Sequence, residues 1–177
     1  MLQVMPAAVH GMGLGLKAYT VAAGKVRFVV LLWDEKTGDL QAVIEAAYMG
    51  QMRTGAASGV ATNYLARLDA STVGIFGSGT QAPAQLEAVC AVRPIEHVRV
   101  HSRSREHRQQ FASEMAERLG VAVEAVDEPR DVVRDADVVI TITNASEPLF
   151  NGDALPAGVH VNAAGSNRAG AREIDAR

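Results

Sequence analysis

The chain has 177 residues, enough for one full domain or for one domain and part of a second. Apolar residues make up 48% and charged residues 21%, which is typical of a soluble globular protein. The net charge of −3, with no block of basic residues, argues against a nucleic-acid or membrane partner. No apolar run is long enough for a membrane helix, and no secretory signal pattern opens the sequence. The single cysteine excludes an intrachain disulfide and favours a reducing compartment, the cytoplasm.

The first part of the chain predicts a hairpin and a helix. Residues 1–16 are rich in Met, Gly and Ala, and we expect a flexible or pocket-lining loop there. Residues 17–21 predict a short strand. Two apolar strands are predicted at 26–33 and 40–45, on either side of a polar turn. A helix is predicted at 48–68, where apolar and small residues recur at helical spacing.

From residue 71 onward, predicted strands and helices alternate. The strands are expected at 72–76, 97–101, 121–126, 137–142 and 159–163. The helices are expected at 80–92, 105–119 and 129–135, with a turn at 152–155. This rhythm predicts an α/β fold with a Rossmann-type doubly wound parallel sheet. We therefore divide the chain into part of a mixed α+β substrate and dimerisation domain, 1–70, and a nucleotide-binding domain, 71–177, that is incomplete at its C-terminal end.

A glycine turn of the form Gly-x-Gly-x-x-Ala joins the first strand and helix of this alternating region. Gly77 lets the chain leave the strand sharply, Gly79 leaves room for a ligand, and Ala82 keeps the helix close to the sheet. A pyrophosphate would lie at the helix start, where free N–H groups and the positive end of the helix dipole point outward. The turn predicts a dinucleotide site; the alternative is a purely structural strand–helix turn.

The end of the second strand of this region indicates which dinucleotide the site would bind. NAD sites normally present Asp or Glu here, whereas this chain has Ser102, Arg103 and Arg105. Arginine is the side chain suited to a phosphate group. NADP(H) is therefore favoured over NAD(H), with a solvated basic loop as the alternative.

Polar residues also follow the fourth and fifth strands. Thr143 and Asn162 would line the crevice at the carboxyl ends of the strands, and Gly165 would permit close approach to a flat ring. Alternatively, Thr143 and Asn162 only cap turns.

Two cations are the best candidates for binding substrate. Arg53 opens the segment Arg-Thr-Gly-Ala-Ala-Ser-Gly, whose small residues would pack tightly and leave the guanidinium projecting. Its planar fork matches a carboxylate. Lys17 is the second candidate and, if desolvated, could also move a proton. The alternative for both is a solvated surface charge.

Other chemistries lack their sequence patterns. The five histidines have no metal-ligand spacing, and neither a Gly-x-Ser-x-Gly elbow nor a P-loop occurs. Cys90 lies in an apolar helix and is expected to be a small buried residue rather than a nucleophile.

Together, these segments resemble the ornithine cyclodeaminase/mu-crystallin family over nearly the whole chain. The matching pieces occur in the family's order: Gly-Leu-Lys17, Lys36-Thr-Gly-Asp39, Met52-Arg53-Thr-Gly-Ala-Ala-Ser-Gly, Gly77-Ser-Gly79-Thr80-Gln81-Ala82, Asp137-Val-Val-Ile-Thr-Ile-Thr143, His160-Val-Asn-Ala-Ala-Gly165-Ser-Asn167 and Arg172-Glu-Ile-Asp175.

The resemblance implies a role for several residues. Lys17 and Arg53 would hold the carboxylate of a small amino or imino acid, with Asn167 also at the substrate. The cofactor contacts would be Gly77, Gly79, Thr80, Gln81 and Ala82 at the pyrophosphate, Ser102 and Arg103 at the adenosine ribose, Thr143, and Val161, Asn162, Ala163 and Ala164 beside the nicotinamide.

One position departs from the cyclodeaminases, which have a proton-carrying aspartate where this chain has Asn167. An amide neither gains nor loses a proton near neutral pH. We therefore favour NAD(P)-dependent hydride transfer at the α-carbon, as in amino-acid dehydrogenases or ketimine reductases. Conversion of ornithine to proline, or NADPH binding without catalysis, remains as an alternative.

The resemblance also implies a homodimer and a chain of roughly twice this length. We expect the 177-residue chain to lack the ends of the substrate domain, including another arginine, and to be inactive alone.

Overall fold

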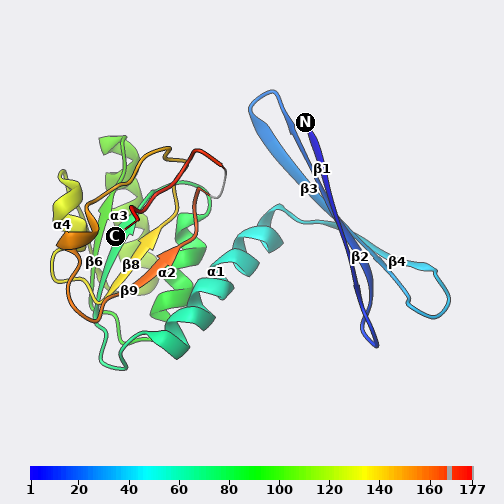
Figure 1. The fold of residues 1–177 in the computed structure, drawn as a ribbon, viewed down its shortest axis with the longest axis horizontal. Helices are drawn as coiled ribbons and strands as arrows, with labels where there is room; N and C mark the ends of the chain where they lie inside the picture. Colours follow the sequence, from blue (N-terminus) through cyan, green and yellow to red (C-terminus); the bar gives the residue numbers. More distant parts are fainter. Residues whose placement is uncertain (167–168, 177) are drawn as a thin grey trace. The chain divides into compact units, whose positions relative to one another are not determined.

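The computed structural model describes residues 1–166 and 169–176 (Figure 1). The chain divides into two compact units, an N-terminal unit, Met1–Gln51, and a C-terminal unit, Met52–Arg177. The predicted functional boundary near residue 70 stays a prediction, because compactness does not report which residues bind a ligand. No helix in the described ranges has the length and apolar character needed to cross a bilayer.

The N-terminal unit is an antiparallel sheet with the strand order β1-β2-β3-β4. The predicted hairpin is confirmed, and its turn is stabilised by Asp34, whose carboxylate accepts the N–H groups of Lys36 and Thr37 at 2.8 Å. Its strands are β1 (Leu2–Val9), β2 (Gly13–Ala22), β3 (Lys25–Trp33) and β4 (Leu40–Glu45).

The expected loop at residues 1–16 is wrong, because most of it forms β1 and the start of β2. Glycine has a low strand propensity, and the alternating glycines therefore suggested a loop. In the structure Gly15 pairs with Leu32 of β3 and with Ala7 of β1. The backbone hydrogen bonds to two neighbouring strands outweigh the local preference. The expected short strand at 17–21 is thus the second half of a longer one, β2.

The helix predicted at 48–68 is α1 (Ala47–Leu65), whose buried face carries small residues. A Cβ added to Gly55 would lie 2.2 Å from the carbonyl oxygen of Ala84, and one added to Gly59 would lie 3.0 Å from Ala88. The two helix backbones therefore approach as closely as the small-residue segment predicted. This contact fixes α1 against α2 (Ala82–Cys90).

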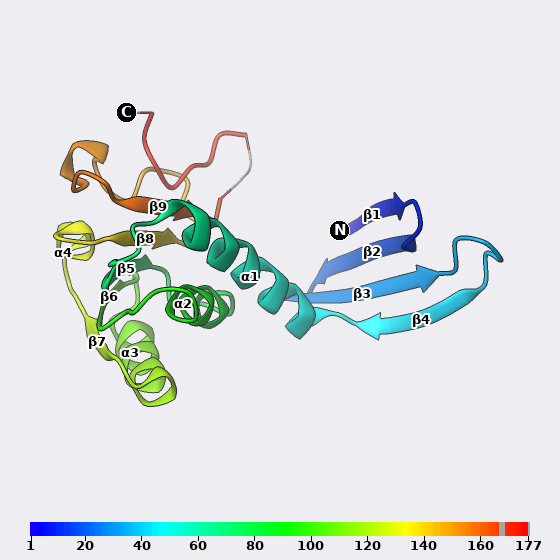
Figure 2. The ribbon, with the colours of Figure 1, turned by 90° about the horizontal axis from the view of Figure 1, so that it is seen from below.

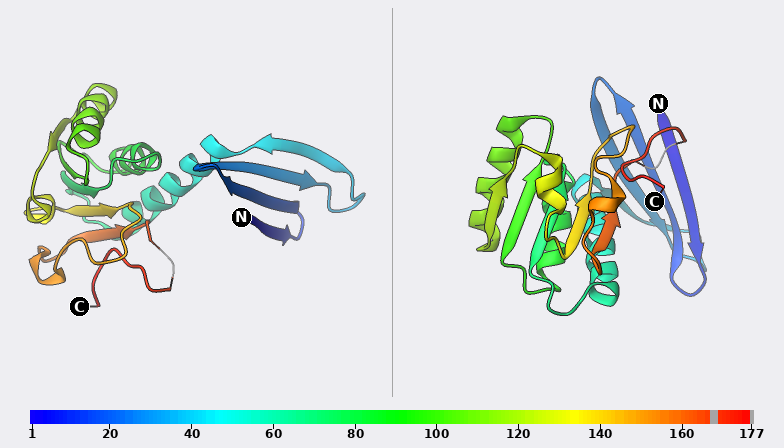
Figure 3. Two further views of the ribbon diagram at one scale, coloured as in Figure 1. Left: turned by 90° about the horizontal axis from the view of Figure 1, so that it is seen from above. Right: turned by 60° about the vertical axis from the view of Figure 1, so that its left-hand side comes forward.

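The C-terminal unit contains a five-stranded parallel sheet in the order β7-β6-β5-β8-β9 (Figure 3). The predicted Rossmann-type fold is confirmed, and the strand order reverses between β5 and β8. The strands are β5 (Thr72–Phe76), β6 (His97–His101), β7 (Ala122–Ala125), β8 (Val138–Thr141) and β9 (His160–Ala163).

Helices cover both faces of this sheet. The α2 helix and α3 (Arg105–Leu119) lie on one face, while α4 (Pro129–Val133) packs on the other (Figure 2). A 3₁₀ turn, η1 (Gly152–Ala154), precedes β9. Strand β5 alternates between the faces, since Val73 and Ile75 pack under α2 and α3 whereas Phe76 packs near α4. Burial on both faces explains the continuous apolar strands.

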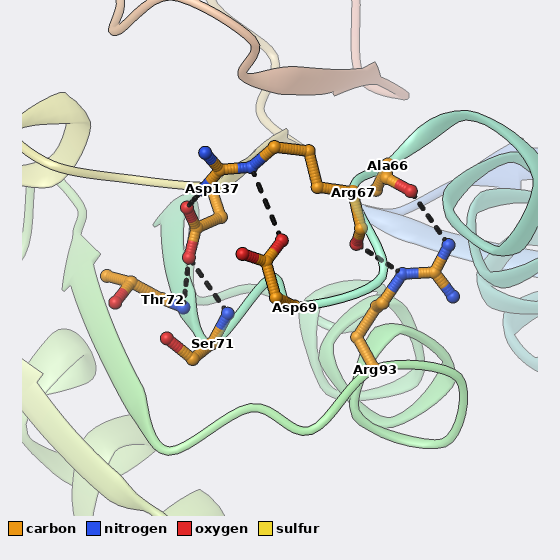
Figure 4. Close-up of polar contacts among 7 residues, drawn as sticks. All are labelled: Ala66, Arg67, Asp69, Ser71, Thr72, Arg93 and Asp137. Carbon is orange, nitrogen blue, oxygen red and sulfur yellow. Dashed lines mark hydrogen bonds and ion pairs between the residues drawn. The ribbon is translucent and has the colours of Figure 1, made fainter.

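A polar cluster joins the end of α1 to the amino ends of β5 and β8 (Figure 4). Arg93 is 5% exposed and donates to the carbonyl oxygens of Ala66 and Arg67, the two residues after α1, at 2.8 and 2.7 Å. It also donates to the Asn63 carbonyl oxygen in the last turn of α1 at 2.9 Å. Asp137 accepts the N–H groups of Ser71 and Thr72 at 2.8 and 3.0 Å and pairs with the Arg67 guanidinium. The cluster lies at the end of the sheet opposite the carboxyl ends of the strands.

Candidate functional site

A cleft of about 930 Å³ lies where β5, β6 and β8 end. Its walls come from the segments that follow these three strands, 76–79, 101–104 and 142–147, together with Leu149. Because β5 and β8 flank the point at which the strand order reverses, this is the place where doubly wound sheets bind ligands.

The glycine turn forms one wall of the cleft. Gly77 has φ +109°, donates its N–H to the carbonyl of His101 at 2.8 Å, and leaves no space for a side chain, since a Cβ would lie 2.5 Å from the Ile142 carbonyl oxygen. Only glycine adopts this conformation without strain. Gly79 is different, because no atom lies within 4 Å of the place a Cβ would take. That open space is available to a ligand.

The start of α2 lies beside this turn. Ala82 is 1% exposed and packs in the sheet core, as predicted, and Pro83 occupies the first turn, where its missing N–H has no helical partner. Within the described ranges, the N–H groups of Thr80 and Gln81 donate to no acceptor of the protein. These two residues and Ala82 are not among those lining the cleft, and their contact with a pyrophosphate stays a prediction.

The loop after β6 is held in place by hydrogen bonds. The Ser78 hydroxyl donates to the Ser102 hydroxyl at 2.8 Å, which links the glycine turn to this loop. Arg108 of α3 is 6% exposed, donates to the Ser102 carbonyl at 2.8 Å and pairs with Asp127. Its guanidinium holds the pKa of the Asp127 carboxyl below its ordinary value. Ser102 is therefore presented at the cleft in a fixed geometry.

Arg103 is exposed at the mouth of the same cleft. Its Nη2 donates to Oδ1 of Asn144 at 3.1 Å, and Asn144 belongs to the segment that follows β8. The structure thus brings together five of the predicted cofactor residues: Gly77, Gly79, Ser102, Arg103 and Thr143.

The predicted residues of β9 do not line the cleft. The Asn162 amide donates to the hydroxyl of Thr62 on α1 at 2.9 Å, and its Oδ1 lies 3.1 Å from Nε2 of His160. Its side chain is therefore used inside the protein. Contact of the cofactor with Val161, Asn162, Ala163 and Ala164 stays a prediction, and for Asn162 it would have to use the backbone.

Glu173 was missed by the sequence analysis, although it lies in the Arg172–Asp175 segment. It is 3% exposed, and its carboxylate accepts hydrogen bonds from Thr141, Thr143 and Gly165. A Cβ on Gly165 would lie 2.2 Å from Oε2 of Glu173. The expectation that Gly165 leaves space for a flat ring is therefore wrong, because the carboxylate fills that space.

The substrate candidates lie on separate compact units. Lys17 is half-buried on β2 of the N-terminal unit, with its Nζ 4.9 Å from the ring centroid of Phe28. Arg53 is exposed on α1 and belongs to the C-terminal unit. Asn167 lies outside the described residues. A joint action of these three residues on a carboxylate stays a prediction.

Two further chemistries receive no support from the described part of the chain. Burial, with a smaller contribution from Glu87, raises the pKa of the Cys90 thiol to about 11, so this thiol is a poor nucleophile at neutral pH. Residues 1–166 and 169–176 contain no cluster of three or more potential metal ligands.

The sequence profile of the ornithine cyclodeaminase/mu-crystallin family matches residues 1–177. The Delta(1)-pyrroline-2-carboxylate reductase of Bacillus cereus is 41% identical over 179 residues, which cover 97% of this chain and 55% of the relative.

Two solved structures are similar in fold and sequence. The Thermococcus litoralis Delta(1)-pyrroline-2-carboxylate reductase, in complex with NADH and L-proline, gives a TM-score of 0.87 at 39% identity, covering 92% of this chain and 53% of that chain. An archaeal alanine dehydrogenase dimer with bound NAD gives 0.91 at 33% identity, covering 98% and 55%. The chain spans about half the length of the relatives it matches.

Proposed function

Because the chain belongs to the ornithine cyclodeaminase/mu-crystallin family, we propose that it carries the nucleotide site of an NAD(P)-dependent oxidoreductase. The reaction would be hydride transfer at the α-carbon of a small amino or imino acid. The observation that carries the proposal is the cleft at the strand-order reversal, where the glycine turn meets Ser102 and Arg103. A cyclic imine related to Delta(1)-pyrroline-2-carboxylate is the substrate class we favour, since the relatives described above include reductases of that compound.

The residues present fit a dinucleotide. Gly79 leaves open space, and the N–H groups of Thr80 and Gln81 at the start of α2, which have no acceptor in the described part of the chain, suit a pyrophosphate. Ser78 and Ser102 would offer hydroxyl groups to the adenosine ribose. When bound, the nicotinamide supplies or accepts the hydride. The chain's contribution is to hold the dinucleotide across the strand ends.

NADP(H) is the cofactor we favour. Arg103 is exposed at the cleft, its only hydrogen bond within the described residues goes to a neutral amide, and Ser102 lies next to it. A 2′-phosphate would offer this guanidinium a stronger, charge-assisted partner than the amide of Asn144. The two similar structures contain NADH and NAD, so the affinities of this chain for NADPH and NADH must be compared directly.

Lys17 and Arg53 are proposed to bind the substrate carboxylate. A pair of cations on a carboxylate would fix the α-carbon, and such positioning lowers a barrier by several kcal/mol. Asn167 would not carry a proton. This favours a reductase or dehydrogenase over a cyclodeaminase. We also propose a homodimer in a reducing cytoplasm, by analogy with the alanine dehydrogenase dimer and from the single thiol, Cys90.

Two measurements test the proposal. Titration of the chain with NADPH and NADH, followed by calorimetry, should give binding of both and tighter binding of NADPH. We expect NADPH oxidation with Delta(1)-pyrroline-2-carboxylate in a chain extended to the length of the relatives, and none with the 177-residue chain alone. Binding of neither cofactor to the chain would refute the nucleotide site, and turnover of ornithine to proline without net cofactor change would favour the cyclodeaminase.

A further inference from the structure

Glu173 holds together three segments at the carboxyl ends of β8 and β9. Its Oε2 accepts from the hydroxyl of Thr141 at 2.9 Å and from the N–H of Gly165 at 2.8 Å. Its Oε1 accepts from the N–H and from the hydroxyl of Thr143, each at 2.6 Å. Its backbone carbonyl accepts the N–H of Leu149 at 2.8 Å. One side chain and its carbonyl thereby fix β8, the loop after it and the turn after β9.

The chemistry of this arrangement requires a carboxylate. Each oxygen accepts two hydrogen bonds, and only an ionised carboxyl group accepts from all four donors without presenting a hydrogen of its own. Within the described residues, no cation pairs with Glu173, and the partners of its buried carboxylate there are these hydrogen-bond donors. Loss of the carboxylate would leave buried donors unpaired.

Glu173 acts on the cleft through other residues. Thr143 and Leu149 line the cleft, whereas Glu173 does not. Both donors of Thr143, its N–H and its hydroxyl, are directed to Glu173. In a doubly wound sheet the adenosine half of a dinucleotide lies over the first three strands, here β5 to β7, and the other half lies over the next two, β8 and β9. The wall that Glu173 fixes therefore belongs to the nicotinamide half.

We propose that Glu173 is a positioning residue for the nicotinamide half of the cofactor. It sets the geometry of Thr143, Leu149 and Gly165 without touching the ligand, and so it determines affinity for the complete dinucleotide but not for its adenosine half. The inference rests on the proposed dinucleotide site.

The test is Glu173→Gln, which keeps the shape but places an NH₂ group against two of the donors. Binding of NADPH and of 2′,5′-ADP, the adenosine half alone, is measured by calorimetry. We expect the affinity for NADPH to fall by about tenfold or more, because the displaced wall must be restored when the nicotinamide half binds, while the affinity for 2′,5′-ADP stays within about twofold. Glu124→Gln, at an exposed carboxylate on β7, is the matched control and should change neither affinity.

Gly165→Ala tests the same contact from the other side. The added methyl would lie 2.2 Å from the carboxylate and must displace it, so the same selective loss of NADPH affinity is expected. Circular dichroism and a cooperative urea unfolding transition show whether each variant is folded, independently of either ligand. Equal loss of both ligands, or no loss of either, in the variants that fold would overturn the positioning role. If the unmodified chain binds neither ligand, the proposed nucleotide site itself fails.

Discussion

Arg103 and Asn144 meet at the mouth of the cleft, with Nη2 of the arginine 3.1 Å from Oδ1 of the asparagine. They follow β6 and β8, two strands separated in the sheet by β5. The contact therefore spans the point at which the strand order reverses. A ligand phosphate at this place would replace a neutral acceptor of Arg103 by a charged one.

Arg103→Ala should reduce the preference for NADPH. A charge-assisted hydrogen bond contributes about 1.5–3 kcal/mol, so the affinity for NADPH is expected to fall by about 10- to 100-fold. The affinity for NADH, which lacks the 2′-phosphate, should change by less than about threefold. Calorimetric titration of both cofactors gives the ratio.

Arg130→Ala is the control for this change. Arg130 is also exposed but lies on α4, away from the cleft. The substitution Arg130→Ala removes the same charge from the protein and should leave the affinities for NADPH and NADH unchanged. A similar loss of NADPH and NADH affinity in Arg103→Ala would contradict a role in recognising the 2′-phosphate.

Gly55→Ala should destabilise the C-terminal unit, although alanine is the better helix former. The new methyl would lie 2.2 Å from the backbone oxygen of Ala84, which is part of α2 and cannot move like the end of a flexible side chain. Such overpacking costs about 1–3 kcal/mol. Urea unfolding followed by circular dichroism measures the loss.

Gly50→Ala provides the comparison on the same helix. Among the described residues, the contact of a Cβ at Gly50 would be with Nζ of Lys17, at 4.0 Å, which is an ordinary distance. This substitution should leave stability unchanged or raise it by up to about 1 kcal/mol. Equal effects of the two substitutions would show that the contact between α1 and α2 is not tight.

Local signals account for the parts of the fold and site that could be predicted. The apolar runs of β5 and β8, and the turn from Gly77 to Ala82, depend on residues adjacent in sequence. The polar ends Ser102 and Thr143 were found because the carboxyl ends of parallel strands meet at one edge.

Long-range partners account for the parts of the fold and the site that could not be predicted from the sequence. Gly15 is in a strand because it pairs with Leu32 of β3, which lies 17 positions later in the sequence. Glu173 is recognisable only through its donors, of which Thr141 and Thr143 lie 32 and 30 positions before it. Neither relationship has a periodic or spacing signature, so no sequence pattern indicated it.

Cys90 should react slowly with thiol reagents in the folded chain. Because burial raises its pKa to about 11, less than about one thiol in a thousand is ionised at pH 7.5. The rate of reaction with Ellman's reagent should rise at least about 100-fold in denaturant, where the thiol returns to its ordinary pKa near 8.5. Cys90→Ala should retain NADPH binding. Rapid labelling of the folded chain would contradict the burial of the thiol.

Asp137→Asn should lower stability in a pH-dependent way. Burial alone would raise the pKa of the Asp137 carboxyl, but the N–H groups of Ser71 and Thr72, together with Arg67, outweigh it and lower the pKa overall (Figure 4). A carboxyl group whose pKa is lowered by folding contributes stability that is fully present above its unfolded pKa, about 3.9. That contribution is lost as the pH falls through the folded-state pKa. The amide replaces a charged acceptor of three donors, so we expect a loss of about 3 kcal/mol at neutral pH.

The difference between the two proteins should therefore be constant from about pH 5 to 8 and shrink below about pH 4, where the carboxyl group is protonated first in the unfolded chain and, at lower pH, in the folded chain. Asp69→Asn is the control in the same cluster. Asp69 is 83% exposed and lies 3.7 Å from Nε of Arg67, so its loss should cost less than about 1 kcal/mol. Urea unfolding at a series of pH values measures both variants. A difference that grows as the pH falls would have the wrong sign for a carboxyl group that is stabilised in its charged form. It would refute the role of Asp137 as a charged acceptor for the N–H groups of Ser71 and Thr72.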